Sequence, residues 1–165
     1  MKGRQKIVKI LIADDDEDDS LLVREAFAES KLIIELNMVR DGEELMNYLH
    51  CQGEYADGCC PSPPSLIFLD LNMPKKGGLE VLKEIKLDPN LRRIPVIVLT
   101  TSMAEEDIYK TYDFGASSFI IKPVSFASLV EMMKNIIKYW FEIVQLPVEA
   151  GGSRDEQKSH QSITS

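Results

Sequence analysis

The chain has 165 residues, a common size for a single domain, and 44% of them are hydrophobic, which is enough for a core. Its 19 Lys and Arg residues stand against 27 Asp and Glu residues, so the formal net charge is -8. An acidic protein is repelled by nucleic acid and by anionic membrane surfaces, because both are negatively charged. We therefore expect neither as a partner.

The three cysteines and two histidines form no motif for a metal or a nucleophile. Cys51 stands apart from the adjacent Cys59 and Cys60, and no CxxC pair occurs. We expect reduced thiols, with no zinc site and no Cys/His nucleophile. Basic residues near the N-terminus precede an apolar run, 10–13, which is too short for a signal peptide or a membrane span. We therefore expect a cytoplasmic protein.

Five apolar stretches of strand length recur along the chain. They are Ile7–Ala13, Ile33–Val39, Leu66–Leu69, Val96–Thr100 and Ser118–Ile121. Continuous Ile, Val and Leu runs, such as PVIVLT at 95–100, favour strands that are buried on both faces, as in a parallel sheet.

Segments with helical spacing of apolar residues lie between these stretches. We expect helices from about Leu21, over 43–49, from Leu79 to the break at Asp88 and Pro89, over 105–114, and from Pro123 to about Val144. This alternation predicts an α/β fold, with a five-stranded parallel doubly wound sheet flanked by five helices. We expect one domain over 1–146. The composition then turns polar, which predicts a flexible tail over 147–165.

The last expected helix is apolar on two sides. One stripe includes Leu129, Met133 and Ile137 and is expected to face the core. A second stripe comprises Met132, Ile136, Tyr139 and Ile143. An apolar stripe on the outer side of a helix needs a covering surface, so we expect a partner chain there.

Polar residues with complementary chemistry follow four of the strands. They are six consecutive acids at 14–19, then Asp70, Thr100 and Lys122. In a doubly wound sheet the reactive site lies at the carboxyl ends of the strands, so these residues should meet. Crowded carboxylates in an open cleft suit Mg²⁺, and a carboxylate is also a competent nucleophile for phosphoryl transfer. A lysine beside it would stabilise the charge on the transferring group.

Each of these residues also has an ordinary structural interpretation. Acids at the start of a helix satisfy its first amides and its dipole, which is the role we favour for Asp18 and Asp19. Asp70 alone could be a turn residue, Thr100 a hydroxyl bonded to the backbone, and Lys122 a solvated charge. Their coincidence at four strand ends favours a functional site.

Four segments resemble the receiver domain of bacterial response regulators. They are ILIADDD at 10–16, IFLDLNMPKKGG at 67–78, PVIVLTTS at 95–102 and GASSFIIKP at 115–123. The resemblance covers roughly residues 5 to 140 and implies a flavodoxin-like fold with strand order 2-1-3-4-5. It also implies a signalling protein of a two-component phosphorelay rather than an enzyme, with a sensor histidine kinase as its partner.

The resemblance assigns the acidic residues. Asp70 would accept the phosphoryl group from the kinase. Asp15, Asp70 and the backbone carbonyl of Asn72 would bind Mg²⁺, and Asp14 would act through a bound water.

The resemblance also implies a conformational switch. Lys122 would contact the acidic cluster and the phosphoryl oxygens, and its bond to Pro123 would be cis. Thr100 would swing toward the phosphoryl group and Phe119 would rotate inward behind it, changing the surface of the fourth helix, fifth strand and fifth helix. The alternative, which we favour less, is that Phe119 is a core aromatic in both states.

Other segments resemble the small response regulators that serve cyanobacterial phytochromes. They are GEYA at 53–56, EEDI at 105–108 and YWFEIVQLP at 139–147. Those proteins are single receivers that dimerise through an extended fifth helix and the segment after it. The resemblance thus implies a homodimer, with an interface that comprises Met132, Ile136, Tyr139, Trp140, Phe141 and Ile143.

Two alternative functions are considered. A Mg²⁺-dependent phosphatase of the haloacid dehalogenase type also uses an aspartate nucleophile, but it requires a second Asp where Asn72 stands. A pseudo-receiver would bind partners without turning over phosphate, and the complete set of acidic, threonine and lysine residues argues against it. Gly77 and Thr101 depart from the usual receiver residues, Asp and a small residue such as Ala, without removing an acceptor, metal or cradle residue.

Overall fold

The computed structural model describes residues 7–28, 30, 32–58 and 60–147, and the expected tail beyond Pro147 lies outside this range. Five parallel strands form one sheet in the order β2-β1-β3-β4-β5. The strands are β1 (Ile7–Ala13), β2 (Ile33–Val39), β3 (Leu66–Leu69), β4 (Val96–Thr100) and β5 (Ser118–Ile121). The predicted strands, the α/β class and the strand order are therefore confirmed.

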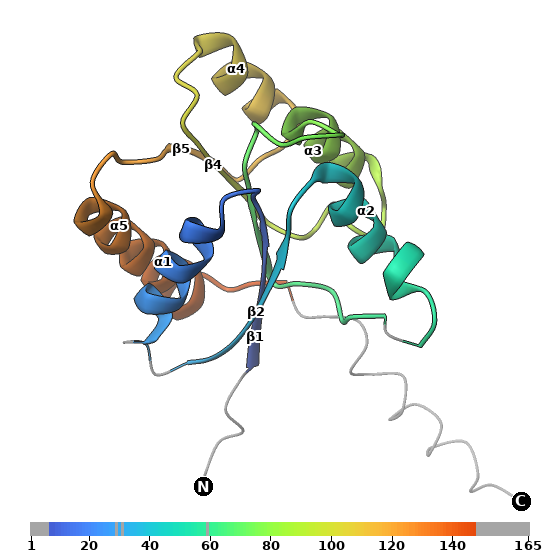
Figure 1. Ribbon diagram of the computed structural model, residues 1–165, viewed down its shortest axis with the longest axis horizontal. Helices are drawn as coiled ribbons and strands as arrows, with labels where there is room; N and C mark the ends of the chain where they lie inside the picture. Colours follow the sequence, from blue (N-terminus) through green and yellow to red (C-terminus); the bar gives the residue numbers. More distant parts are fainter. Residues whose placement is uncertain (1–6, 29, 31, 59, 148–165) are drawn as a thin grey trace, which may run out of the picture.

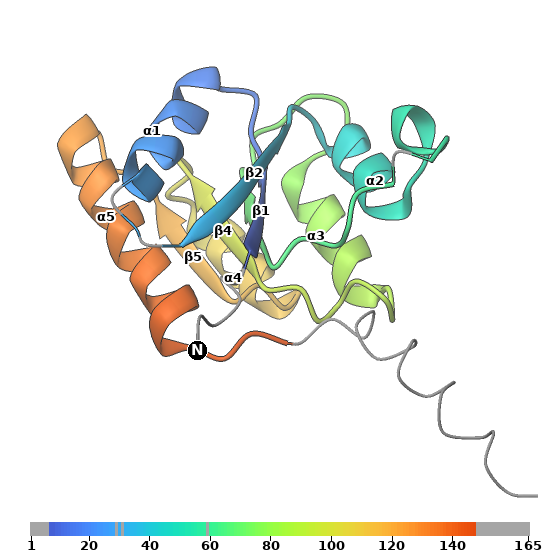
Figure 2. The same ribbon diagram turned by 90° about the horizontal axis from the view of Figure 1, so that it is seen from below.

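Five helices connect and cover the strands. They are α1 (Glu17–Ala28), α2 (Gly42–His50), α3 (Gly78–Leu87), α4 (Glu105–Asp113) and α5 (Phe126–Lys138). Helices α1 and α5 lie on one face of the sheet, and α2, α3 and α4 lie on the other (Figure 1, and Figure 2 from below). The carboxyl ends of the parallel strands therefore meet at one edge, between the two helical layers.

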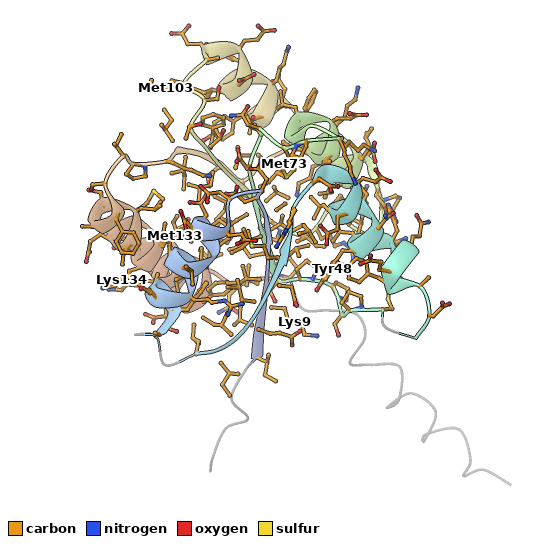
Figure 3. All side chains as sticks on the ribbon, in the orientation of Figure 1. Lys9, Tyr48, Met73, Met103, Met133 and Lys134 are labelled. Carbon is orange, nitrogen blue, oxygen red and sulfur yellow. A yellow bond between two sulfur atoms is a disulfide. The ribbon has the colours of Figure 1, made fainter. Side chains whose placement is uncertain are left out.

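Alternate residues of a strand face opposite layers. In β1, Leu11 packs with the residues of α2 and α3, whereas Ile10 and Ile12 pack with those of α1 and α5. Figure 3 shows the two sides through Tyr48, which belongs to the first cluster, and Met133, which belongs to the second. Burial on both faces explains why the central strands β3 and β4 are continuously apolar.

The helix ends differ in how they are capped. Asp41 accepts a hydrogen bond from the Glu44 amide at the start of α2, and Ser125 accepts one from the Ser128 amide at the start of α5. Helices α3 and α4 begin after Gly77 and Ala104 with no side-chain cap. A short 3-10 turn, Gly53–Tyr55, follows α2. No helix in the described part of the chain is long and apolar enough to span a bilayer.

The C-terminal helix is shorter than expected as an α-helix. Its α-helical part ends at Lys138, and a wider π-helical turn, Tyr139–Ile143, carries the chain to the expected end near Val144. The second apolar stripe is divided: Ile136 is buried in the core, whereas Tyr139 and Ile143 are 52% and 63% exposed. An open groove of about 910 Å³ runs between β5 and α5, lined in part by Ile120, Met132, Tyr139 and Trp140.

Two of the three cysteines form a disulfide bond. Cys51 and Cys60 are joined, with their Cα atoms 5.0 Å apart, so the expectation of reduced thiols is wrong for this pair. Cys51 follows α2 in the left-handed conformation, with φ at 55°. The chain turns there, and the loop that follows brings Cys60 back within the usual Cα separation for a disulfide. Cys59 lies outside the described residues.

Candidate functional site

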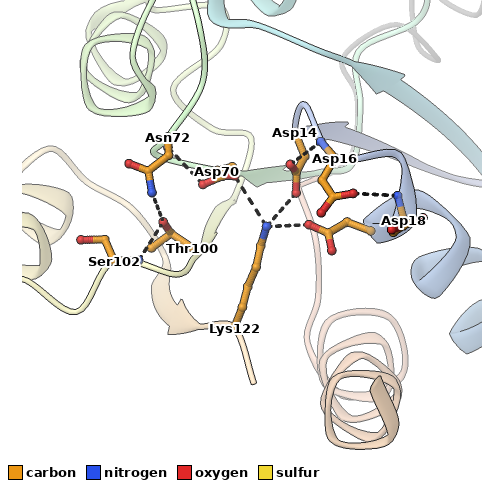
Figure 4. Close-up of polar contacts among 9 residues, drawn as sticks. Asp14, Asp16, Asp18, Asp70, Asn72, Thr100, Ser102 and Lys122 are labelled. Atoms are coloured by element: carbon orange, nitrogen blue, oxygen red, sulfur yellow. Dashed lines mark hydrogen bonds and ion pairs between the residues drawn. The ribbon is translucent and has the colours of Figure 1, made fainter. Parts of the chain in front are cut away.

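The predicted site residues meet at the carboxyl edge of the sheet. Asp14, Asp70, Thr100 and Lys122 come from the ends of β1, β3, β4 and β5, and Figure 4 shows them around one centre. Asp14, Asp70 and Thr100 are buried. The sheet order therefore brings together residues that lie as far as 108 positions apart in the sequence.

The Lys122 ammonium lies among three carboxylates. Its Nζ is 2.9 Å from Asp14 Oδ2, 2.5 Å from Asp19 Oδ2 and 3.6 Å from Asp70 Oδ2. The side chain is 10% exposed, so the interpretation of Lys122 as a solvated charge is wrong. Burial would lower the pKa of Lys122, but the hydrogen bonds to Asp14 and Asp19 outweigh it and raise this pKa above its ordinary value. Lys122 is thus a permanent cation at the site.

Asp19 belongs to the site, although its position in the sequence suggested a role at the helix N-terminus. Burial would raise its pKa, but its hydrogen bonds with Asp14 and Lys122 lower it below the ordinary value. A signal for this role was present in the sequence. Asp19 lies three and four positions before Leu22 and Val23, which are buried, so it shares the inward face of α1. Asp18 is exposed and lies in the first turn of α1, where its charge suits the helix dipole, while its amide donates to Asp16 Oδ1.

The acidic residues fit a divalent cation. Asp14, Asp15 and Asp70 place carboxylate oxygens within 4.8 Å of one another, with Asp15 on the exposed side. Burial, together with a hydrogen bond to Asp19, raises the pKa of Asp14 to about 7. Burial thus favours the protonated form of this carboxyl group, and a cation bound beside it would favour the ionised form. An open edge with few carboxylate ligands is the kind of site that Mg²⁺ prefers, because it keeps several waters.

Asp70 is held by the turn that follows β3. Its amide donates to the Ala13 carbonyl at 2.9 Å, and its Oδ1 accepts from the Asn72 amide at 3.0 Å. Helix α3 begins directly against this turn. A Cβ atom on Gly78 would lie 2.5 Å from the Asp70 carbonyl oxygen, whereas a Cβ atom on Gly77 would meet nothing within 4 Å. Glycine is therefore required at 78, and the unusual glycine at 77 is not required by sterics.

The Thr100 hydroxyl oxygen accepts two hydrogen bonds, one from the loop after β3 and one from the loop after β4. The donors are Asn72 Nδ2 at 3.5 Å and the Ser102 amide at 3.3 Å. The ordinary interpretation, a hydroxyl bonded to the backbone, therefore holds in this conformation. Ser102 in turn donates from its hydroxyl to Asp107 Oδ2 at 2.7 Å, in the first turn of α4. Thr101 beside it is exposed.

Phe119 lies on β5 behind Thr100. Its side chain is partly buried and packs against the core under α2 and α3. Its backbone amide donates to the Tyr112 hydroxyl of α4 at 3.2 Å. The inward rotation of Phe119 stays a prediction.

The bond between Lys122 and Pro123 is trans, as are all peptide bonds in the described ranges. The cis bond implied by the resemblance is therefore wrong for this structure. A trans bond before proline is favoured by about 0.5–1 kcal/mol, and Lys122 reaches Asp14 and Asp19 from it.

The fold and this cluster are those of a receiver. The family model for the response regulator receiver domain matches residues 10–134, and the chain belongs to this family. Membership rules out the haloacid dehalogenase alternative and places the chain in a signalling family rather than among classical enzymes. Response regulator Rcp1 from Synechocystis sp. is 45% identical over 139 residues, which cover 84% of this chain and 92% of that relative.

Two solved structures extend the likeness. The phosphorylated cyanobacterial phytochrome response regulator RcpA aligns with a TM-score of 0.81 and 45% identity, covering 87% of this chain and 100% of RcpA. The Mn²⁺-bound form of Rcp1 aligns with a TM-score of 0.80 and 43% identity, covering 86% of this chain and 99% of that one. The chain is thus a receiver-domain response regulator related to Rcp1 and RcpA, and phosphorylation by a kinase fits its family.

Proposed function

We propose that a sensor histidine kinase of the phytochrome type phosphorylates this chain on Asp70, with Mg²⁺ at the acidic cluster. The observation that carries the proposal is the position of Asp70. Its carboxylate lies within 3.6 Å of the Lys122 ammonium and within 4.8 Å of oxygens on Asp14 and Asp15. An acceptor of phosphoryl groups needs a carboxylate with positive charge on one side and a metal site on another.

The chain's own residues have distinct parts in the transfer. An Asp70 carboxylate oxygen forms a bond to phosphorus while the bond from phosphorus to the kinase histidine nitrogen breaks, and nitrogen keeps the electron pair. Asp15, Asp70 and the Asn72 carbonyl would hold Mg²⁺, with Asp14 acting through a bound water, and the ion would supply positive charge for the phosphoryl oxygens. Lys122 already lies beside Asp70 Oδ2 and adds a second positive charge.

The response to phosphorylation starts at Thr100. The phosphoryl group adds negative charge and acceptor oxygens, which attract the Thr100 hydroxyl away from Asn72 and Ser102. The space that Thr100 leaves admits the Phe119 ring. The surface formed by α4, β5 and α5 changes as a result.

The test is uptake of a phosphoryl group or of its analogue. Wild-type protein with Mg²⁺ and acetyl phosphate should gain one phosphoryl group by intact mass, and beryllofluoride should bind. Asp70→Asn should abolish both. Asp16→Asn is the matched control, because Asp16 lies in the same acidic loop, is exposed and is outside the carboxylate cluster. Wild-type protein that takes up neither reagent would instead support a pseudo-receiver.

We further propose a homodimer that forms through α5 and the segment after it. Tyr139 and Ile143 are exposed apolar residues, and Tyr139 lines the groove between β5 and α5 together with Met132 and Trp140. Phe141 is partly buried against the core. Ile136 would support the interface from beneath, because it is buried in the core. Exposed apolar surface of this kind marks sites of protein association.

Sedimentation of single variants tests the dimer. Tyr139→Ala and Ile143→Ala should each weaken dimerisation. Leu87→Ala is the matched control, because it removes an exposed apolar side chain, 72% accessible, from α3 on the other face of the sheet. A monomeric wild type, or a dimer that neither α5 variant weakens, would count against the interface.

We propose the cytoplasm as the location, because a histidine kinase forms its phosphohistidine from ATP there. The Cys51–Cys60 disulfide opposes this proposal, since disulfides are rare in reducing compartments. Alkylation of free thiols in intact cells, followed by mass analysis, would decide. Labelling of Cys51 and Cys60 supports a reducing location, and protection of both opposes it.

A further inference from the structure

Helix α4 is held by very little apolar packing. Thr111 is its single buried residue, and the Thr111 hydroxyl has no hydrogen-bond partner. Tyr109 on the same helix is 72% exposed. A buried hydroxyl without a partner lowers stability, so the packing of the middle of α4 does little to fix the helix in place. Besides its packing on α3 and β5, it is held by side-chain hydrogen bonds near its two ends.

The first end of α4 is linked to Thr100. The Ser102 amide donates to the Thr100 hydroxyl oxygen, and the Ser102 hydroxyl donates to Asp107 in the first turn of the helix. No side-chain cap from Ala104 replaces this link. A displacement of the Thr100 hydroxyl therefore removes one of the contacts that hold Ser102, the residue whose side chain bonds the first turn.

The second end of α4 is linked to β5 at Phe119. Strand β5 is the edge of the sheet, and amides of successive residues in a strand point in opposite directions. The Lys122 amide donates inward to the Thr100 carbonyl, whereas the Phe119 amide, three positions earlier, donates outward to the Tyr112 hydroxyl at 3.2 Å. Tyr112 itself is 51% exposed. Its hydroxyl thus caps the open edge of the sheet at the residue expected to rotate.

We propose that Tyr112 is a positioning residue of the switch. Its hydroxyl holds β5 at Phe119 in the conformation described here, and this hydrogen bond breaks when Thr100 moves toward a phosphoryl group on Asp70. The proposal rests on the proposed function. Helix α4 connects the movement of Thr100 to the breaking of the Tyr112–Phe119 hydrogen bond. One end of the helix is linked to Thr100 through Ser102, and the other end is linked to Phe119 through Tyr112.

A hydrogen bond that exists in one of two conformations biases the equilibrium between them. Removing it shifts the population toward the other conformation by the factor that the bond contributed. A single neutral hydrogen bond contributes roughly fivefold. Tyr112→Phe keeps the ring and removes only the acceptor. It should therefore make the Phe119 amide exchange with solvent roughly fivefold faster and strengthen apparent beryllofluoride binding by a similar factor.

Amide exchange and beryllofluoride titration followed by NMR measure both quantities on the full chain. The comparison uses wild type, Tyr112→Phe and the matched control Tyr109→Phe, which removes a hydroxyl from the same helix at an exposed position. In saturating beryllofluoride and Mg²⁺, the Phe119 amide should exchange at the same rate in all three proteins. Tyr109→Phe should match wild type throughout.

Three results would overturn the proposal. The first is unchanged exchange at Phe119 in Tyr112→Phe without beryllofluoride, and the second is a difference that persists unchanged in saturating beryllofluoride. The third is faster exchange in Tyr112→Phe with no gain in beryllofluoride affinity, which would make the bond merely structural. If wild type binds no beryllofluoride, the proposed function fails and the coupling fails with it. Failure of Tyr112→Phe alone, with normal binding by wild type, refutes only the role of Tyr112.

Discussion

Helices α3 and α4 cover the same face of the sheet, yet they are attached to it in different ways. Helix α3 buries Val81, Leu82 and Ile85 completely and begins against the backbone of Asp70, the proposed acceptor. Helix α4 buries only Thr111 and is tied at its ends by hydrogen bonds. One side of the site is therefore fixed by core packing, whereas the other is held largely by hydrogen bonds and is the side that moves under the proposed function. A receiver needs both, because phosphoryl transfer demands a rigid acceptor while signalling demands a displaced surface.

The largest expected difference is in the free energy of unfolding, between a variant in α3 and a variant in α4. Leu82→Ala removes a fully buried side chain of α3 and should lower the free energy of unfolding by about 4 kcal/mol, because a cavity remains. Tyr109→Ala on α4 should change it by less than about 0.5 kcal/mol. Urea denaturation of both variants measures this difference. Equal losses would show that α4 is as firmly packed as α3.

Alanine substitutions at the adjacent Gly77 and Gly78 should differ in their effect on stability, because only Gly78 lies against the Asp70 backbone. Gly78→Ala places a Cβ against the Asp70 carbonyl and the Leu71 Cα, and should lower the free energy of unfolding by about 3 kcal/mol and slow phosphoryl uptake. Gly77→Ala has open space around it and should cost about 0.5 kcal/mol. Denaturation and acetyl phosphate assays of the pair test this. Similar losses of stability for Gly78→Ala and Gly77→Ala would mean that the backbone of the turn after β3 shifts at little cost to accommodate the added Cβ.

Mg²⁺ should stabilise the folded protein by binding the cluster of Asp14, Asp15 and Asp70. At a free Mg²⁺ concentration about 100 times its dissociation constant, the free energy of unfolding should rise by about 2.7 kcal/mol, because the ion binds the folded cluster. Asp15→Asn should reduce this gain with little effect in EDTA, since Asp15 is the exposed member of the cluster. Urea denaturation with Mg²⁺ and with EDTA measures the gain. Stabilisation that survives in Asp15→Asn would place the ion elsewhere.

The smallest effect concerns the start of α3. Gly77 precedes this helix in an extended conformation and offers no side chain to its free amides. Gly77→Asp supplies a cap and a negative charge at the helix N-terminus, so we expect a rise of about 0.5 kcal/mol in the free energy of unfolding. Comparing the urea denaturation midpoints of Gly77→Asp, Gly77→Ala and wild type shows whether the added cap raises the free energy of unfolding. A loss of stability would show that the added charge is dominated by repulsion from the acidic cluster.

The strands and most of the site could be predicted because their signals are local. A strand such as Val96–Thr100 is buried at every position, and a parallel sheet makes such strands continuously apolar. The residues at the strand ends then converge by topology alone. Asp14, Asp70, Thr100 and Lys122 were predicted in this way, and the structure brings them together.

Other features could not be predicted because they depend on the path of the chain or on a side-chain direction. The Cys51–Cys60 bond follows from a left-handed turn that residue spacing does not reveal. Asp19 carries a helical-spacing signal, three and four positions before Leu22 and Val23, but its contact with Lys122 depends on where α1 begins, and element boundaries are the least certain part of a sequence prediction. The link between Tyr112 and Phe119 requires knowing which amides of β5 point outward, and that requires the register of the sheet.

The ammonium at the centre of the site comes from a residue 108 positions after its partner Asp14. During synthesis, Asp14 and Asp70 leave the ribosome well before Lys122 does. Until β5 joins the edge of the sheet, the carboxylates have no lysine beside them. Under the proposed function, a chain that ends before Lys122 should accept a phosphoryl group on Asp70 more slowly than the full chain, because the ammonium that stabilises the transferring charge is missing.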